Sequence, residues 1–413
     1  MDYLSASEID IAFLAVGLLV TSLGLFSTVL KQRLYLTEPI VALAVGVLLS
    51  PAVLGWIDLA HWGNPDGILE QGARLAIAIQ LMAVALRIPR RYPFKQWRTL
   101  AILLGLVMPL MWLTSGLLVY WILGVPFGVA MLIGAVLTPT DPVVSTAVVT
   151  GVIAERHLPP RIRHALATES AINDGMALPF VMLTILLLNR PLGDALSHWV
   201  FTTLLWEVGG AVVIGTLLGY GAGKLLVWSE VKATADKASF LTFTLGLTLL
   251  VLAGVSLAGS NGILAVFAAG LGLDWAVGAQ ERAEEENVQE VIDRFFTLYI
   301  FVLLGLSLPW QSWLALGWQG VGLAIAILAF RRLPAVLLVR PLLGQLQPLQ
   351  DALFVGWFGP LGAAAVFYAF VALKETGLEQ AWTVGSLVVC LSILVHGITA
   401  VPLTKLYGRQ HSQ

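Results

Sequence analysis

Charged residues and cysteine are both scarce in this chain. Asp, Glu, Lys and Arg make up only 12% of its 413 residues, about half of the share in an ordinary soluble domain. Cys390 is the single cysteine, which excludes a disulfide within the chain and gives no support to a cysteine-based metal site. The sequence also lacks a long charged tail and any stretch with the composition of a separate soluble domain. We therefore expect one continuous unit over residues 1–413.

Apolar residues, by contrast, are abundant. They account for 58% of the positions and gather in many runs of about 20 residues, the length of helix that crosses the hydrocarbon core of a bilayer. The composition therefore predicts an all-α polytopic membrane protein with about thirteen transmembrane helices. The predicted spans are residues 9–30, 34–54, 71–87, 99–123, 126–153, 161–188, 199–227, 239–259, 261–277, 294–308, 318–343, 350–373 and 382–405.

The basic residues between these spans are distributed unevenly. With the spans placed as above, eighteen Lys and Arg residues fall on one side of the bilayer, and only Arg190 and Lys374 fall on the other. Loops rich in Lys and Arg stay on the cytoplasmic side of a membrane. We therefore expect a protein of the inner or plasma membrane of the cell, with its N-terminus outside and its C-terminus in the cytoplasm.

Two of the apolar segments contain polar interruptions. The first reads Leu-Thr-Pro-Thr-Asp-Pro at 137–142 and the second Thr-Glu-Ser-Ala-Ile-Asn-Asp-Gly at 168–175. Pro139 and Pro142 lack an N–H and obstruct the helix before them, so the first segment is expected to break there. Exposed backbone at membrane depth is tolerated only where it is buried in protein or lines a cavity. A carboxylate there costs about 3 kcal/mol on insertion scales. The pattern therefore indicates an ion site that contains Asp141 and Asp174.

The second interruption places its polar side chains on one side of a helix. At about 3.6 residues per turn, Ser170 and Asp174 share one stripe, and Glu169 and Asn173 share the stripe beside it. We assign Ser170 and Asp174 to the ion and expect Glu169 to have a structural partner elsewhere in the chain. The competing interpretation is that these groups only hold helices together by hydrogen bonds. Two carboxylates beside a broken helix are more than that role requires.

These motifs resemble those of the monovalent cation/proton antiporters. Thr-Asp-Pro at 140–142, Glu-Ser at 169–170 and Asn-Asp-Gly at 173–175 are similar to the pattern of sodium/proton exchangers with an Asn-Asp motif. The runs Asn-Asp-Gly-Met-Ala-Leu-Pro-Phe at 173–180 and Gly-Trp-Phe-Gly-Pro-Leu-Gly-Ala at 356–363 most resemble the branch that contains the yeast plasma-membrane sodium/proton antiporters. The resemblance covers essentially the whole chain. It implies a membrane transporter and not an enzyme.

A second predicted helix is interrupted by glycine and proline. Span twelve carries Gly356, Gly359, Pro360 and Gly362. It comes seven spans after the break at Pro139, so the two interrupted helices cross the membrane in opposite directions, which indicates an inverted repeat. We expect repeats of six helices each at 9–188 and 239–405, joined by span seven at 199–227, with the broken helices crossing near mid-membrane. The alternative is that these glycines only allow close helix packing.

Two arginines, Arg331 and Arg332, lie in the middle of span eleven. An arginine at that depth requires a partner, and Glu169 is the natural one. The family resemblance implies a glutamate–arginine pair of this kind and favours Arg332 over Arg331. Such a pair is structural, and it prevents Glu169 from titrating with the transported ion.

A single titratable carboxylate is enough to exchange two kinds of cation. Burial favours the protonated form of a carboxylate and a bound Na+ favours the charged form, so the two ions compete for Asp174. We expect Na+ at Asp174, Ser170 and Thr140, with Asp141 as a further ligand, directly or through water. Asn173 is expected to bridge the break in span five and span six by hydrogen bonds.

The resemblance therefore implies a secondary active antiporter that exchanges cytoplasmic Na+ or Li+, with K+ a further candidate, for external H+ by alternating access. It also implies a homodimer in a lipid bilayer, with no cofactor besides the transported ions and no nucleic-acid partner. Two alternatives stay open. One is a passive monovalent-cation channel, although a channel normally repeats its polar ring around a pore. The other is a membrane-embedded hydrolase with Asp141 and Asp174 as a dyad, which leaves Glu169 and Arg332 unexplained.

Overall fold

The protein is all-helical wherever its structure is described. The structure is a computed structural model, which describes residues 6–141, 144, 146–231, 239–277 and 298–410. Eight helical stretches in these residues are long and apolar enough to cross a membrane, in agreement with the predicted class of fold. These stretches are Ser7–Phe26, Pro65–Arg87, Trp97–Leu123, Pro160–Asn189, Leu192–Ser229, Phe240–Leu257, Trp310–Leu342 and Glu379–Gln410.

The helices follow one another with short connections. The long ones are α1 (Ala6–Val29), α4 (Pro65–Arg87), α7 (Met108–Leu123), α11 (Pro160–Asn189), α13 (Ala211–Val231), α14 (Ser239–Leu257), α17 (Trp310–Phe330) and α21 (Glu379–Gln410). The shorter ones are α2 (Glu38–Leu49), α3 (Leu59–Trp62), α5 (Tyr92–Lys95), α6 (Trp97–Ile102), α8 (Phe127–Val136), α9 (Thr146–Val149), α10 (Gly151–His157), α12 (Leu192–His198), α15 (Gly262–Ala276), α18 (Leu333–Val339), α19 (Leu349–Trp357) and α20 (Ala363–Thr376). Residues 298–306 are also helical. Segments of π-helix join α6 to α7 and α12 to α13.

Both predicted breaks are present. Helix α8 ends at Val136, residues 137–141 are not helical, and α9 begins at Thr146. Helix α19 ends at Trp357, residues 358–362 are not helical, and α20 begins at Ala363. The two breaks touch, because the Asp141 N–H donates to the Pro360 carbonyl at 2.8 Å. Pro142, to which we also ascribe the first break, lies outside the described residues.

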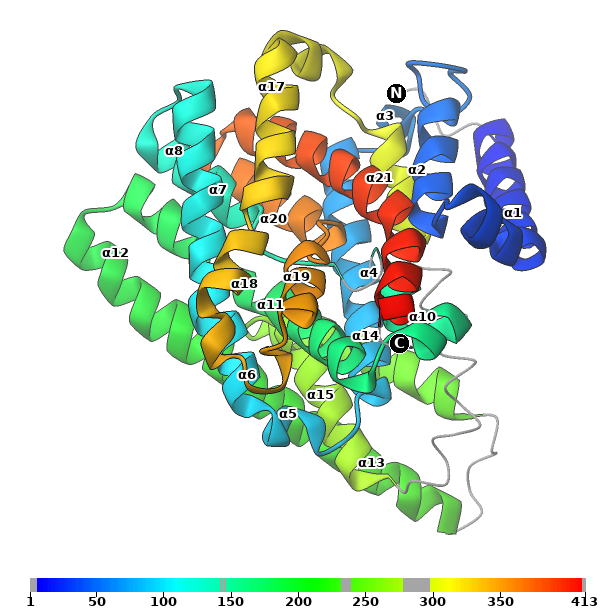
Figure 1. Cartoon of the computed structure of the whole chain (residues 1–413), viewed down its shortest axis with the longest axis vertical. Coiled ribbons are helices and arrows are strands. Elements are labelled where there is room, and N and C mark those ends of the chain that lie inside the picture. The colour runs from blue at the N-terminus through cyan, green and yellow to red at the C-terminus, as the bar shows by residue number, and fades with distance from the viewer. Residues whose placement is uncertain (1–5, 142–143, 145, 232–238, 278–297, 411–413) are drawn as a thin grey trace.

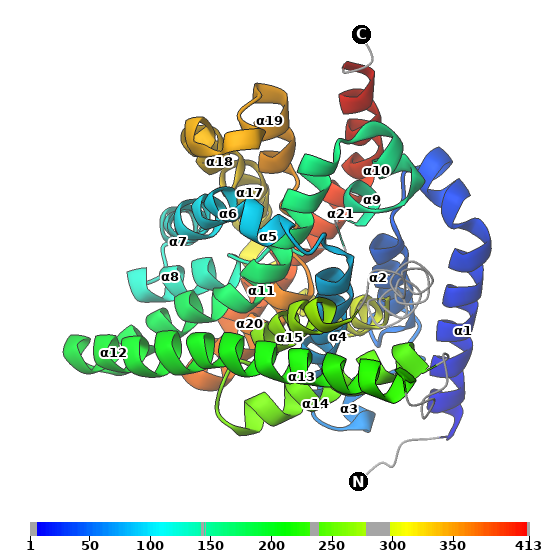
Figure 2. The ribbon, with the colours of Figure 1, turned by 90° about the horizontal axis from the view of Figure 1, so that it is seen from below.

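Helix α11 lies in the middle of the molecule (Figures 1 and 2). It contacts α8 and α20, which adjoin the two breaks, and also α15. Helix α15 packs mainly against α13, α4 and α14. Helices α1 and α12–α13 lie at the edges of the molecule in both views. The two breaks, at 137–141 and 358–362, are buried within the molecule beside α11.

Burial differs widely between the long helices. In the most apolar part of α4, 72% of the residues are buried, whereas in that of the α12–α13 stretch only 17% are buried. Outward side chains of that stretch, such as Phe201, Leu217 and Trp228, are well exposed. A contiguous apolar surface of this kind is stable in contact with acyl chains and not with water. The exposed apolar belt therefore agrees with an integral membrane protein.

Some predicted span limits are wrong. Span seven begins at Leu192 and not at residue 199, and span eleven begins at Trp310 and not at residue 318. Pro191 and Pro309 directly precede these helices, a favourable place for proline. Hydropathy predicts only the limits of the apolar segment, and the polar residues of α12 lie outside that segment. Several predicted spans coincide with helices too short to identify by length, so the number thirteen stays a prediction.

Candidate ion-binding site

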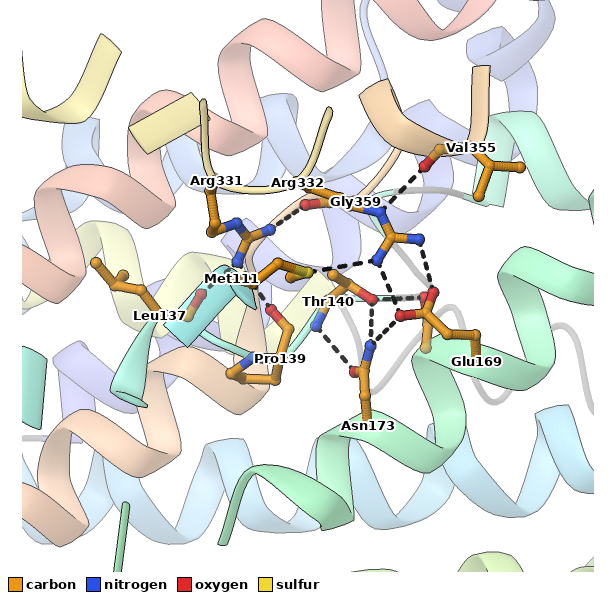
Figure 3. Close-up of polar contacts among 11 residues, drawn as sticks. Met111, Leu137, Pro139, Thr140, Glu169, Asn173, Arg331, Arg332, Val355 and Gly359 are labelled. Carbon is orange, nitrogen blue, oxygen red and sulfur yellow. Dashed lines mark hydrogen bonds and ion pairs between the residues drawn. The ribbon is translucent and has the colours of Figure 1, made fainter. Parts of the chain in front are cut away.

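Polar side chains gather where the break after α8 faces α11. Asn173 contacts both Thr140 and Glu169 in this cluster (Figure 3). Its Oδ1 accepts the Thr140 N–H at 2.9 Å, and its Nδ2 donates to Thr140 Oγ1 at 2.7 Å and to Glu169 Oε1 at 2.8 Å. Ser170 Oγ lies 2.9 Å from Thr140 Oγ1. All of these side chains are fully or almost fully buried. Asn173 thus accepts a hydrogen bond from the Thr140 N–H, a backbone group that the break leaves without a helical partner.

Glu169 lies against Arg332. Arg332 Nη1 and Nη2 each lie 2.9 Å from a different carboxylate oxygen of Glu169, in a two-pronged ion pair. Arg332 Nε also donates to the Val355 carbonyl of α19 at 3.0 Å. The pair therefore joins α11 to the start of α18 and to the helix before the second break (Figure 3). Because both charges are buried, each depends on the other for its stability.

Arg331 has a separate role, which the sequence reasoning missed. Its guanidinium donates to the carbonyls of Leu137 and Gly359, and to that of Pro139 at 3.3 Å. Leu137 and Pro139 follow the C-terminus of α8, and Gly359 follows that of α19. Helix C-termini carry partial negative charge and unsatisfied carbonyls. Arg331 therefore neutralises both half-helix ends and ties the two breaks together. The visible signal was the double arginine at mid-span.

The second break is also held from α21. Ser392 Oγ accepts the Leu361 N–H at 2.8 Å and lies 3.0 Å from His396 Nδ1. His396 Nε2 lies 3.1 Å from the Trp357 carbonyl, within hydrogen-bonding distance. Two backbone groups released by the break after α19 thus find partners on one face of α21. His396 accordingly has a structural environment in this arrangement.

The Asp141 carboxylate accepts hydrogen bonds from two backbone N–H groups. Its Oδ1 accepts the Val144 N–H at 3.2 Å, and its Oδ2 accepts the Ala363 N–H at 2.8 Å, at the start of α20. A carboxylate at a helix N-terminus is favoured by the helix dipole. A Cβ on Gly362 would overlap this carboxylate, so the chain approaches it closely. In this structure Asp141 thus joins the first break to the helix that follows the second.

Asp174 lies one turn further along α11 than Ser170, and its carboxylate has fewer hydrogen-bond partners than that of Asp141. It is 1% exposed, and its Oδ1 has no hydrogen-bond partner among the described residues. Its backbone carbonyl accepts the Tyr368 hydroxyl of α20 at 2.7 Å. A buried carboxylate oxygen without a donor is an orphaned acceptor, which a proton or a cation can satisfy.

Direct contacts therefore bring together Thr140, Ser170, Asn173, Glu169 and Arg332, and Asp174 lies one turn further along α11. Thr140, Asn173 and Glu169 are engaged with one another or with Arg332, and Asp141 is engaged with the backbone. Asp174 retains an unshared oxygen. A hard cation favours carboxylate and hydroxyl oxygens of this type.

The chain is similar to known proteins over most of its length. Residues 18–406 match the family described as "Sodium/hydrogen exchanger, transmembrane". The chain is 35% identical over 381 residues to Na(+)/H(+) antiporter 2 of Zygosaccharomyces rouxii, covering 90% of this chain and 47% of that protein. It is 29% identical over 435 residues to a Na(+)/H(+) antiporter of Schizosaccharomyces pombe, covering 99% and 93%. The chain spans about half the length of the first relative.

A solved structure shares the fold. The sodium proton antiporter MjNhaP1 from Methanocaldococcus jannaschii superposes with a TM-score of 0.75. The match covers 97% of this chain and 100% of that one, at 20% sequence identity.

Proposed function

Because this chain belongs to the sodium/hydrogen exchanger family, we propose that it is an antiporter that exchanges a monovalent alkali cation, Na+ or Li+, for H+ across a membrane. The observation that carries this proposal is the buried Asp174 carboxylate, which has an unshared oxygen beside two broken helices. Membrane transporters bind their substrates where discontinuous helices meet. The yeast-type relatives support the assignment of Na+.

Exchange follows from competition for one carboxylate. A proton neutralises Asp174, whereas a cation stabilises its charged form. Both ions cannot occupy the same oxygen atoms, so one ion must leave before the other binds. Asp174, the Ser170 hydroxyl and oxygen atoms of Thr140 form the proposed cation site. Asp141 contributes from the break, directly or through a water molecule.

The remaining residues of the cluster position this site. Asn173 fixes the break against α11 through Thr140, and Arg332 pairs with Glu169. Arg331 holds the carbonyl ends of α8 and α19. The polar groups released by the breaks thus have partners within the protein, and Asp174 is left to bind the transported ion.

We further propose alternating access by relative movement of two groups of helices, in the arrangement of inverted repeats at 9–188 and 239–405. The backbone contact between Asp141 and Pro360 supports the crossing of the two broken helices. The proposed N-terminus is outside and the C-terminus cytoplasmic, in the plasma or inner membrane, and a homodimer is proposed from the family resemblance.

Everted vesicles that carry a pH-sensitive dye test the function. Added Na+ or Li+ should dissipate an imposed proton gradient, and Asp174→Asn should abolish the response while the protein remains folded. A cation channel predicts conduction in the absence of a proton gradient, and either that result or full activity of Asp174→Asn would contradict the proposal. A series with Na+, Li+ and K+ then gives the selectivity.

A further inference from the structure

One backbone carbonyl beside Asp174 has lost its helical hydrogen bond. Pro179 lies inside α11 and has no N–H. In an α-helix that N–H bonds the carbonyl of the fourth residue before it, which here is Gly175, the residue directly after Asp174. A buried carbonyl at membrane depth requires another donor.

The donor comes from a different helix. Asn261 Nδ2 donates to the Gly175 carbonyl at 3.0 Å. The Oδ1 of the same side chain accepts the Leu264 N–H at 3.1 Å and so caps the N-terminus of α15. Asn261 is 8% exposed. Because both ends of its amide have a partner, the orientation of the side chain is fixed.

The two helices approach closely at this point. A Cβ on Gly175 would lie 2.8 Å from Leu264 Cβ and 3.1 Å from Leu264 Cα. The preceding carbonyl, that of Asp174, is bonded by Tyr368 of α20. Two successive carbonyls of α11 are therefore held from two sides, one by α20 after the second break and one by α15 from the group that contains α4, α13 and α14.

We propose that Asn261 is a positioning residue for the Asp174 carboxylate. It supplies from α15 the hydrogen bond that Pro179 denies to Gly175, and it thereby fixes the turn of α11 that carries the ion-binding group. The consequence for transport rests on the proposed function. Without this bond, the turn is no longer tied to α15, and the Asp174 carboxylate loses its fixed position relative to Thr140 in the break.

Two substitutions test this proposal, one that removes the hydrogen bond from Asn261 and one that replaces it with a backbone N–H at residue 179. Asn261→Ser keeps an oxygen that caps α15 but is too short to reach Gly175. Pro179→Ala restores the N–H that the Gly175 carbonyl lacks. We expect Asn261→Ser to raise the apparent KM for Na+ in proteoliposomes about tenfold, as the loss of a hydrogen bond to a buried carbonyl implies, with a smaller change in kcat. Adding Pro179→Ala should restore the KM to within about twofold of the Pro179→Ala value.

Asn64→Ser is the matched control, because Asn64 caps α4 through the Asp66 N–H and is expected to leave KM unchanged. A wild-type KM in Asn261→Ser, or a double variant as impaired as Asn261→Ser, would overturn the proposal. If Asn261→Ser does not fold, recovery of folded protein in the double variant is the same rescue, and no recovery overturns it.

Thermal unfolding of the same variants tests the bond without transport. Asn261→Ser should lower Tm, and the Pro179→Ala background should remove at least half of that decrease. Additive Tm shifts would overturn the inference. If the wild-type protein does not exchange Na+ for H+, the proposed function fails on that result, while the Tm comparison still decides whether Asn261 replaces the N–H missing at Pro179.

Discussion

Removal of one partner of the Glu169–Arg332 pair should destabilise the protein far more than removal of an exposed charge. Both side chains are almost fully buried, with exposures of 2% and 3%, and they share two contacts of 2.9 Å. Water cannot replace the lost partner without a large rearrangement. A buried charge left unpaired costs about 3–5 kcal/mol, so we expect Glu169→Gln and Arg332→Gln each to lower the free energy of unfolding by that amount.

The double variant Glu169→Gln/Arg332→Gln should lose less than the sum of the two single variants. It leaves no uncompensated charge, and a Gln at 169 retains an oxygen for the Asn173 amide. The expected coupling energy is on the order of 2–4 kcal/mol. The assay is denaturant unfolding of the purified proteins in a mild detergent, followed by tryptophan fluorescence.

An ion pair of the same chain with one exposed partner is the control. Arg163 Nη1 lies 3.8 Å from Glu155 Oε1, and the Glu155 side chain is 63% exposed. Glu155→Gln should change the free energy of unfolding by less than about 1 kcal/mol. Additive losses at Glu169 and Arg332, or losses no larger than that of Glu155→Gln, would refute the reasoning, because a desolvated and mutually dependent pair cannot behave in either way.

Three further predictions concern the breaks and the partly buried Tyr92 at the start of α5. Arg331→Gln should lower the free energy of unfolding by about 3 kcal/mol through the loss of charged hydrogen bonds, and Arg331→Lys should lower it less because the charge is kept. Denaturant unfolding measures both variants, and equal losses would contradict the role of the charge. Gly362→Ala should reduce the rate of Na+/H+ exchange at least tenfold and lower the free energy of unfolding by about 1–3 kcal/mol through overpacking, because a Cβ there overlaps the Asp141 carboxylate. A Cβ on Gly24 meets nothing within 4 Å, so the control Gly24→Ala should leave the rate of exchange unchanged. Burial raises the pKa of Tyr92 to about 12 against the hydrogen bond from Gln345. Its contribution to stability is therefore complete below pH 10 and is lost as the pH rises towards 12. The difference between the ultraviolet titrations of the wild-type protein and Tyr92→Phe isolates this phenol, and a Tyr92 phenol that ionises near its ordinary value would contradict this.

The breaks and the polar face of α11 were predictable from local chemistry. Pro139 and the glycines around Pro360 cannot continue a helix, and the four-residue spacing of Ser170 and Asp174 places both on one side of any helix. The hydrogen bonds of the Asn173 amide to the break were also predictable, because a break releases backbone groups that a nearby amide can bond.

The partners supplied by distant elements were not predictable from the sequence. Arg331 is adjacent to Arg332, and only the three-dimensional arrangement gives them different targets, carbonyls for one and Glu169 for the other. Asn261 reads as an ordinary N-cap, because its bond to Gly175 joins residues 86 positions apart. The exposed start of α12 was missed for another reason, since hydropathy does not register a helix that extends beyond the apolar segment.

The most direct test of the central claim is the pH dependence of the apparent KM for Na+ in proteoliposomes. If one carboxylate, Asp174, serves both ions, protons compete with Na+, and on the acidic side the apparent KM should rise about tenfold for each unit of decrease in pH, while the maximal rate at saturating Na+ stays constant. An apparent KM that does not change with pH, in a protein that still exchanges the two ions, would contradict the account.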